Sequence, residues 1–167
     1  MAGIQVRSSA FEYNELIPRR YRMDGENVSP DLTWSGVADG AAELLLLCED
    51  PDAPRRTFLH WLVTGIDPAC TGIESGGRPD SGRVWRNDFG EFGYSGPQPP
   101  VGDQAHRYYF RVFALAEPVR LPRHPSAAAV HLTIRGTELA SGALVGRYQR
   151  SPSLPRPARA FQPLRWR

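Results

Sequence analysis

An apolar run that ends in an Asp- and Pro-rich segment constrains this chain more than any other feature. Residues 44–48 read Leu-Leu-Leu-Leu-Cys, and a run of that length beside turn residues is typical of a strand buried on both faces. Residues 50–54 read Asp-Pro-Asp-Ala-Pro; the two prolines remove backbone donors and disfavour helix in the residues before them. Residues 58–63, Phe-Leu-His-Trp-Leu-Val, return to strand composition. The sequence therefore predicts two buried strands joined by a stiff loop that carries two carboxylates.

The polar residues of this unit are candidates for a functional site. Asp50 and Asp52 lie in the loop, and His60 is a polar side chain set into the second strand. Two carboxylates and an imidazole on a rigid scaffold suit anion binding or proton transfer. A structural alternative stays open for both kinds of residue. A lone strand histidine is usually a hydrogen-bonded core residue, and Asp52 could be a turn residue whose side chain caps its own loop.

Composition narrows the class of protein. The chain has 167 residues, of which 41% are hydrophobic and 23% charged, as expected for one globular domain with its own core. A net charge of +2 is too small to indicate nucleic-acid binding. The sequence contains neither an apolar stretch long enough to span a membrane nor a signal-peptide core, so we expect a cytoplasmic protein. Cys48 and Cys70 lack metal-ligand spacing; Cys48 is expected in the core, and a Cys48–Cys70 disulfide is disfavoured in a reducing compartment.

The remaining elements predict a β-rich fold. Residues 106–116 are the clearest strand, with His106 and Tyr108 on the face expected to point inward. Ser126 is a candidate N-cap for one late helix that runs to about residue 141, with Gly142 as its stop, and residues 143–148 form a final strand. We expect two packed antiparallel sheets.

Two segments rich in Gly and Pro separate these strands. Residues 67–83 are predicted to be a long connection, and loops of that length are often functional. Residues 87–102 carry four glycines and three prolines, which excludes helix and central strand. Glycine allows positive φ and proline fixes φ, so this segment is expected to present backbone N–H groups to a ligand.

The C-terminal residues differ in composition from the rest of the chain. Residues 151–167 contain arginine and proline but no acidic residue, which is typical of an extended or disordered tail. Phe161, Leu164 and Trp166 are candidate anchors to the domain or to a partner. We therefore expect a domain over residues 1–150 and a tail over residues 151–167.

Three spaced blocks of residues form a pattern that resembles a known family. They are Asp50-Pro51-Asp52-Ala53-Pro54 with His60-Trp61, Gly96-Pro97-x-Pro99-Pro100-x-Gly102 followed by His106-Arg107-Tyr108, and Gly25-x-Asn27-Val28-Ser29-Pro30-x-Leu32-x-Trp34. In this combination they resemble the phosphatidylethanolamine-binding protein (PEBP) family, in its bacterial Raf-kinase-inhibitor-like branch. The resemblance runs from about residue 11 to Arg150.

The resemblance implies a β-sandwich with Greek-key connections and a small, metal-free pocket for phosphate, acetate or a phospholipid head group. Carried over residue by residue, the ligand-binding set is Asp50, Asp52, Ala53, His60, His106 and Tyr108, with Gly96 and Pro97 at the rim. One carboxylate is expected to orient a histidine. Members of this branch often carry Cys where this chain has Gln98, which puts a redox role of that position in doubt.

Three functions remain open at this level. The first is a binding protein for a small anion or phosphorylated head group, favoured because the sequence has no Gly-x-Ser-x-Gly elbow and no Cys in the pocket loop. The alternative is a small-molecule enzyme, such as a cyclase, isomerase or hydrolase, with Asp50, His60 and His106 as general acid–base residues. The third is modulation of a protein partner such as a kinase, which rests on the resemblance alone. We expect no metal and no cofactor, and homodimer formation stays open.

Overall fold

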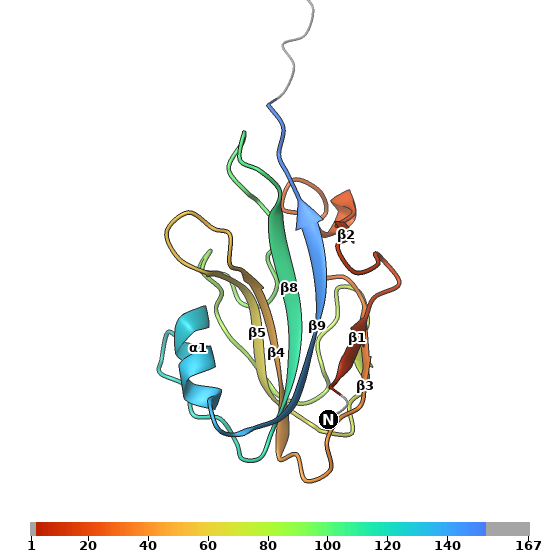
Figure 1. Ribbon diagram of the computed structural model, residues 1–167, viewed down its shortest axis with the longest axis vertical. Helices are drawn as coiled ribbons and strands as arrows, with labels where there is room; N and C mark the ends of the chain where they lie inside the picture. The colour runs from red at the N-terminus through yellow and green to blue at the C-terminus, as the bar shows by residue number, and fades with distance from the viewer. Residues whose placement is uncertain (1–2, 153–167) are drawn as a thin grey trace, which may run out of the picture.

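In residues 3–152, two β-sheets and one α-helix are arranged in three layers (Figure 1). The computed structural model describes residues 3–152. The predicted tail, with Phe161, Leu164 and Trp166, therefore lies outside the described residues except for its first two positions. The elements in chain order are β1 (Gln5–Arg7), β2 (Glu15–Leu16), a 3-10 helix (Arg19–Tyr21), β3 (Leu32–Ser35), β4 (Glu43–Asp50), β5 (Phe58–Ile66), β6 (Gly72–Ile73), β7 (Arg83–Val84), β8 (His106–Leu115), α1 (Ala127–Ile134) and β9 (Glu138–Tyr148).

The larger sheet has the strand order β2-β9-β8-β4-β5-β7, and the smaller one has the order β1-β3-β6. The predicted two-sheet architecture is confirmed. Pairing is antiparallel, as predicted, apart from the short edge pair in which β2 runs parallel to β9. The Greek-key connection stays a prediction. Residues 67–83 are more than a loop, because β6 lies within them and completes the smaller sheet.

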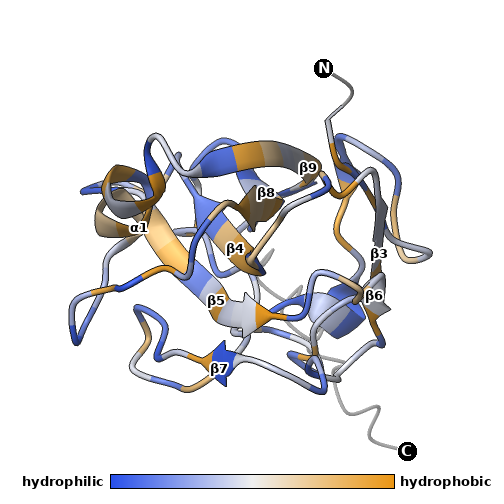
Figure 2. Cartoon of the chain, turned by 90° about the horizontal axis from the view of Figure 1, so that it is seen from below, coloured by the Kyte–Doolittle hydropathy of each residue, from blue (hydrophilic) through white to orange (hydrophobic). Residues whose placement is uncertain are grey.

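The apolar run predicted to be buried forms the middle of the larger sheet. Every residue of β4 is buried, and alternate residues face opposite sides. Leu44, Leu46 and Cys48 join the core between the two sheets, whereas Leu45 and Leu47 join a second cluster beneath α1. Apolar residues accordingly colour both β4 and the helix in Figure 2. Burial on both faces explains why this stretch lacks the alternation of a half-exposed strand.

The helix is shorter than predicted. Ser126 caps it as expected, since its hydroxyl accepts from the Ala129 N–H at 3.1 Å. The expected end near residue 141 was wrong, because α1 stops at Ile134 and Gly136 turns the chain at φ +86°. Residues 138–148 then form one long strand, and Gly142 lies inside it rather than ending the helix. A helix of eight residues suffices to bury Ala127, Val130 and Ile134 on the sheet.

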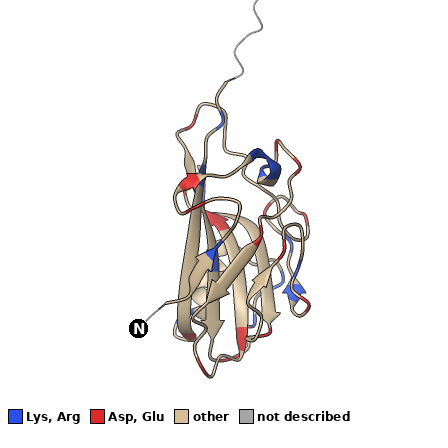
Figure 3. Ribbon diagram, turned by 90° about the vertical axis from the view of Figure 1, so that its right-hand side faces the viewer, with Lys and Arg blue, Asp and Glu red and all other residues tan. Residues whose placement is uncertain are grey.

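Cys48 and Cys70 are both free, so the Cys48–Cys70 disulfide that the sequence left open is absent. Cys48 is buried in the core, as predicted. Charged residues lie mainly in loops and at strand ends (Figure 3). In the described part of the chain, no helix is both long and apolar enough to cross a membrane.

Candidate functional site

Four predicted site residues meet where β4 ends and β5 and β8 begin. Asp50 is the last residue of β4, His60 lies in β5, and His106 and Tyr108 lie in β8. Antiparallel pairing of β4 with both neighbours brings these ends together. All four residues are buried, with exposed fractions of 1–4%. The buried strands therefore hold polar groups in fixed positions, which lowers the cost of ordering them around a ligand.

These side chains line a small pocket of about 180 Å³. Its lining residues are Asp50, Ala53, Pro54, Phe58, His60, Phe89, Gln98, Pro99, Pro100, His106 and Tyr108. Phe58 and Phe89 form an apolar wall, with ring centroids 4.9 and 5.7 Å from that of His60. A wider hollow of about 1010 Å³ lies beside β7 and contains none of the predicted site residues. The smaller pocket, with several polar groups against an apolar wall, has the usual character of a ligand site.

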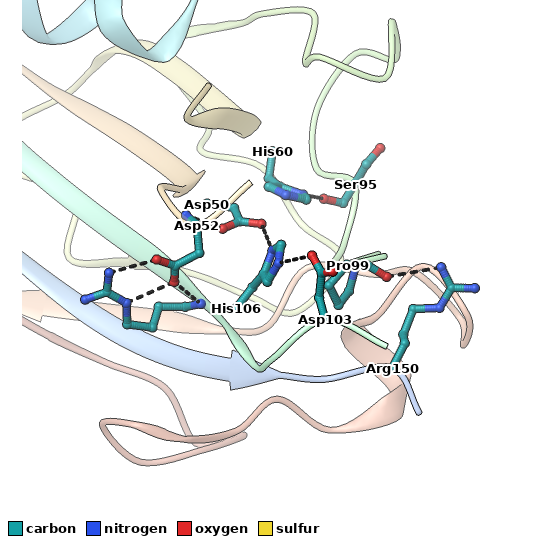
Figure 4. A network of polar contacts seen from close by, with 9 residues as sticks. Asp50, Asp52, His60, Ser95, Pro99, Asp103, His106 and Arg150 are labelled. Atoms are coloured by element: carbon teal, nitrogen blue, oxygen red, sulfur yellow. Dashed lines mark hydrogen bonds and ion pairs between the residues drawn. The ribbon is translucent and has the colours of Figure 1, made fainter. Parts of the chain in front are cut away.

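His106 is held between two carboxylates (Figure 4). Its Nδ1 lies 2.7 Å from an Asp50 carboxylate oxygen, and its Nε2 lies 3.2 Å from an Asp103 carboxylate oxygen. Burial opposes a charged imidazole, but the hydrogen bonds and charges of Asp50 and Asp103 outweigh burial and raise the pKa of His106. The expected contact between a carboxylate and a histidine is therefore present.

Asp50 and Asp52 have different partners. Asp50 also accepts from the Asp52 backbone N–H at 2.8 Å, so Asp50, rather than Asp52, caps the turn. Asp52 forms a two-oxygen pair with the Arg107 guanidinium at 2.9 Å and accepts from the Arg107 backbone N–H at 2.9 Å. The hydrogen bonds from Arg107 hold the pKa of Asp52 below its usual value. Asp52 does not line the pocket; it ties the loop to β8.

A backbone carbonyl fixes the ring of His60. Its Nδ1 lies 2.7 Å from the Ser95 carbonyl oxygen. Because a carbonyl only accepts, Nδ1 carries the hydrogen. Burial lowers the pKa of His60 to about 4, and the carbonyls of Ser95 and Gly96 offset only part of that effect. His60 is therefore neutral at neutral pH.

The Tyr108 hydroxyl is buried and has no hydrogen-bond partner within residues 3–152. Burial, together with the charge of Asp50, raises the pKa of Tyr108, so the hydroxyl keeps its proton. An unpaired buried hydroxyl costs about 1–3 kcal/mol, and Tyr108 is one of the residues that line the pocket. A ligand that accepts a hydrogen bond from Tyr108 would remove this cost.

The Gly/Pro segment, residues 87–102, supplies part of the pocket lining. Gln98, Pro99 and Pro100 line the pocket, whereas Gly96 and Pro97 are buried and do not line it. The Gly96 N–H donates to the Asn27 side-chain oxygen at 2.7 Å, and the prolines have no N–H. The Phe89 N–H donates to the Asn87 side-chain oxygen at 2.9 Å. Presentation of backbone N–H groups to a ligand by this segment stays a prediction.

Sequence reasoning missed several contributors to the pocket. Phe58, Phe89 and Asp103 were not predicted, although an aromatic residue two positions before His60 is a signal that β5 directs both to one side. Asn27 belongs to the third block of the family pattern, and the structure explains it as the support of Gly96. Arg150 donates to the Pro99 carbonyl at 3.2 Å, so the segment that follows β9 also braces the pocket loop.

A β-sandwich with a small, preformed polar pocket at the end of its central strands defines a class of ligand-binding protein. The family model described as "Phosphatidylethanolamine-binding protein" matches residues 7–149, and the chain belongs to this family. Membership supports a ligand-binding role.

Relatives extend beyond bacteria. The chain is similar to a UPF0098 protein of the archaeon Methanothermobacter thermautotrophicus, with 40% identity over 88% of this chain and 99% of that protein. It is 38% identical to a Mycobacterium tuberculosis protein named as a candidate lipoprotein, LppC, over 87% of this chain and 72% of that protein. The crystal structure of E. coli YbcL, titled a new member of the mammalian PEBP family, superposes with a TM-score of 0.81 at 31% identity, covering 89% of this chain and 99% of that one.

Proposed function

We propose that this chain binds a small anion or a phosphorylated head group in the pocket bordered by Asp50, His60, His106 and Tyr108. The observation that carries the proposal is Tyr108, which lines a preformed pocket and whose buried hydroxyl has no partner among residues 3–152. Phosphate, carboxylate and phosphorylated head groups all offer the acceptor oxygen that this hydroxyl needs. The pocket volume of about 180 Å³ suits a group of that size rather than a whole lipid.

The pocket geometry favours binding over catalysis. Both His106 nitrogens are engaged by carboxylates, so His106 has no free nitrogen to take a proton from a substrate. His60 has no carboxylate partner among the described residues, and a pKa of about 4 makes it a weak base at neutral pH. The enzyme alternative with Asp50, His60 and His106 therefore receives less support than ligand binding.

The Tyr108→Phe substitution separates ligand recognition from a structural role. We expect the affinity for inorganic phosphate to fall about tenfold or more, because one hydrogen bond to a charged oxygen is lost. The unliganded variant should be at least as stable as the wild type, since an unpaired buried hydroxyl has been removed. Titrations of inorganic phosphate, phosphoethanolamine and acetate, followed by protein NMR, measure the affinity; urea denaturation measures the stability.

The matched control is Tyr109→Phe. Tyr109 is the next residue of β8, and its hydroxyl accepts from Arg107 at 3.2 Å rather than bordering the pocket. This variant should bind like the wild type. If the wild type shows no saturable shift with any of the three ligands, or if Tyr108→Phe binds as well as the wild type, the proposal fails.

Modulation of a kinase or another protein partner, a cytoplasmic location and homodimer formation remain predictions. The relative named as a candidate lipoprotein makes the location worth testing directly, by fractionation of cells that express the full chain. Recovery with the membrane fraction would overturn the cytoplasmic prediction.

A further inference from the structure

Three adjoining hollows lead from the proposed ligand pocket to the start of α1. The pocket is the first, and the middle hollow, of about 310 Å³, shares Ala53, Pro54 and Phe58 with it. The third, which we call the arginine hollow, has a volume of about 160 Å³ and shares Arg56 and Asp88 with the middle hollow. Because neighbouring hollows share lining residues, a ligand that extends out of the pocket can follow them to the arginine hollow.

The arginine hollow is lined by three guanidinium groups and one carboxylate. Arg56, Arg86 and Arg123 supply the positive charges, and Asp88 is the acidic residue among the described residues of the lining. With the lining histidine neutral, three positive charges and one negative charge leave +2, as much as the whole chain carries. Ser126, the N-cap of α1, also lines the hollow, so the partial positive charge of the helix N-terminus adds to the same side. A concave surface of this charge attracts an anion.

Two of the three arginines have no acidic partner in the described part of the chain. Arg56 lies 3.6 Å from Asp88, whose carboxylate also accepts from the Leu59 N–H at 2.8 Å. Within residues 3–152, neither Arg86 nor Arg123 forms an ion pair with a carboxylate, and both residues are exposed. Their charges are therefore available to an anion that enters the arginine hollow.

The loop that carries Arg86 is fixed by its own contacts. The Arg86 guanidinium lies over the Phe92 ring, 4.7 Å from the ring centroid, and the two residues form a β-bridge. The side chain of the buried Asn87 makes four hydrogen bonds with residues 89–95. A preordered loop reduces the entropy that Arg86 loses when it binds an anion.

Building on the proposed function, we propose that the arginine hollow is a second anion-binding site, which takes the far anionic group of a ligand whose first anionic group lies in the pocket. The ligand class is a molecule with two phosphate groups joined by a largely apolar spacer. Arginine binds phosphate oxygens through paired N–H groups. Ala53, Pro54 and Phe58 in the middle hollow give the spacer an apolar surface to pack against.

The terminal bisphosphates of propanediol, hexanediol and nonanediol test this assignment, each compared with the alkyl monophosphate of the same length. Calorimetric titration of the full chain at neutral pH gives the Kd values, and NMR shifts of the Tyr108 and Arg123 amides report which site is occupied. At the best spacer length, we expect the bisphosphate to bind at least about tenfold more tightly than its monophosphate, because one molecule then engages two sites.

The double variant Arg86→Ala/Arg123→Ala should reduce this gain to less than about threefold, a margin that allows for either end of the bisphosphate entering the pocket. Both side chains are exposed, so we expect the variant to fold, and the comparison in the wild type tests the second site even if it does not. The matched control is Arg120→Ala/Arg135→Ala. It removes two exposed arginines that line none of the three hollows and should keep the full gain.

The outcomes separate the second site from the proposed function. If no bisphosphate binds more tightly than its monophosphate, or if the gain survives in Arg86→Ala/Arg123→Ala, the second site is overturned while the proposed function stays intact. Bisphosphate binding that shifts the Arg123 amide but not the Tyr108 amide would overturn the proposed function and the two-site ligand together. The absence of binding by all six compounds would do the same.

Discussion

Replacing Glu49 with Ala should destabilise the domain by about 2–3 kcal/mol, although Glu49 lies outside the pocket. Its carboxylate is 4% exposed and lies 2.7 Å from Arg111 Nε in β8 and 2.8 Å from His131 Nε2 in α1. Breaking a buried ion pair costs about 3–5 kcal/mol. We expect less here, because Arg111 and His131 are partly exposed and can be hydrated when Glu49 is removed.

Urea denaturation of Glu49→Ala and Glu117→Ala measures this effect. Glu117 is an exposed carboxylate without an ion pair among the described residues, so its removal should change the free energy of unfolding by less than about 0.5 kcal/mol. Asp50, the next residue, faces the pocket, so Glu49→Ala should leave phosphate affinity unchanged as long as the domain is folded. Equal stability of the two variants would show that the helix does not depend on Glu49.

The second large effect is a loss of stability on acidification that originates from His60. Its pKa falls from 6.5 to about 4 on folding, so between these values the unfolded chain binds a proton that the folded chain rejects. Stability from this group is complete above pH 6.5 and is lost as pH falls towards 4. The full effect is about 3 kcal/mol. His106 affects the free energy of unfolding above pH 6.5 and in the opposite direction. Because its pKa is raised in the folded protein, its contribution to stability is lost as pH rises.

The wild type and His60→Gln are compared by the pH dependence of their free energies of unfolding. The difference between the two isolates the contribution of His60. Free energies of unfolding measured at pH 4, 5, 6 and 7 should fall more steeply for the wild type than for the variant, because the carboxylates titrate in both. The ring signals of His60 in the wild type give its pKa directly, even if the variant does not fold. A His60 pKa near 6.5, or equal slopes for the two proteins, would contradict the burial argument.

The sequence predicted the fold best where burial leaves a strong pattern. The run at residues 44–48, the strand at 106–116 and the inward side of His106 and Tyr108 all follow from apolar content and alternation. The end of the helix was missed because residues 136–141 contain no residue that forbids helix, and the choice is made by pairing of β9 with β8. Short strands such as β2 and β6, with two residues each, have no local signal at all.

The sequence predicted which residues lie at the site better than it predicted the contacts among them. Strand alternation and the family pattern located Asp50, His60, His106 and Tyr108, which do meet at one pocket. Which carboxylate contacts His106, and which caps the loop, depends on the position of Arg107 and Asp103 in space. Spacing along the chain carries no information about those contacts, so Asp52 was assigned to the pocket although it pairs with Arg107.

A crystal structure of the full chain with inorganic phosphate at pH 5.5 tests the central claim most directly. The binding proposal predicts phosphate in the pocket, with one oxygen within hydrogen-bond distance of the Tyr108 hydroxyl. An empty pocket at saturating phosphate, or phosphate bound only at surface arginines, would contradict the claim that this pocket is the ligand site.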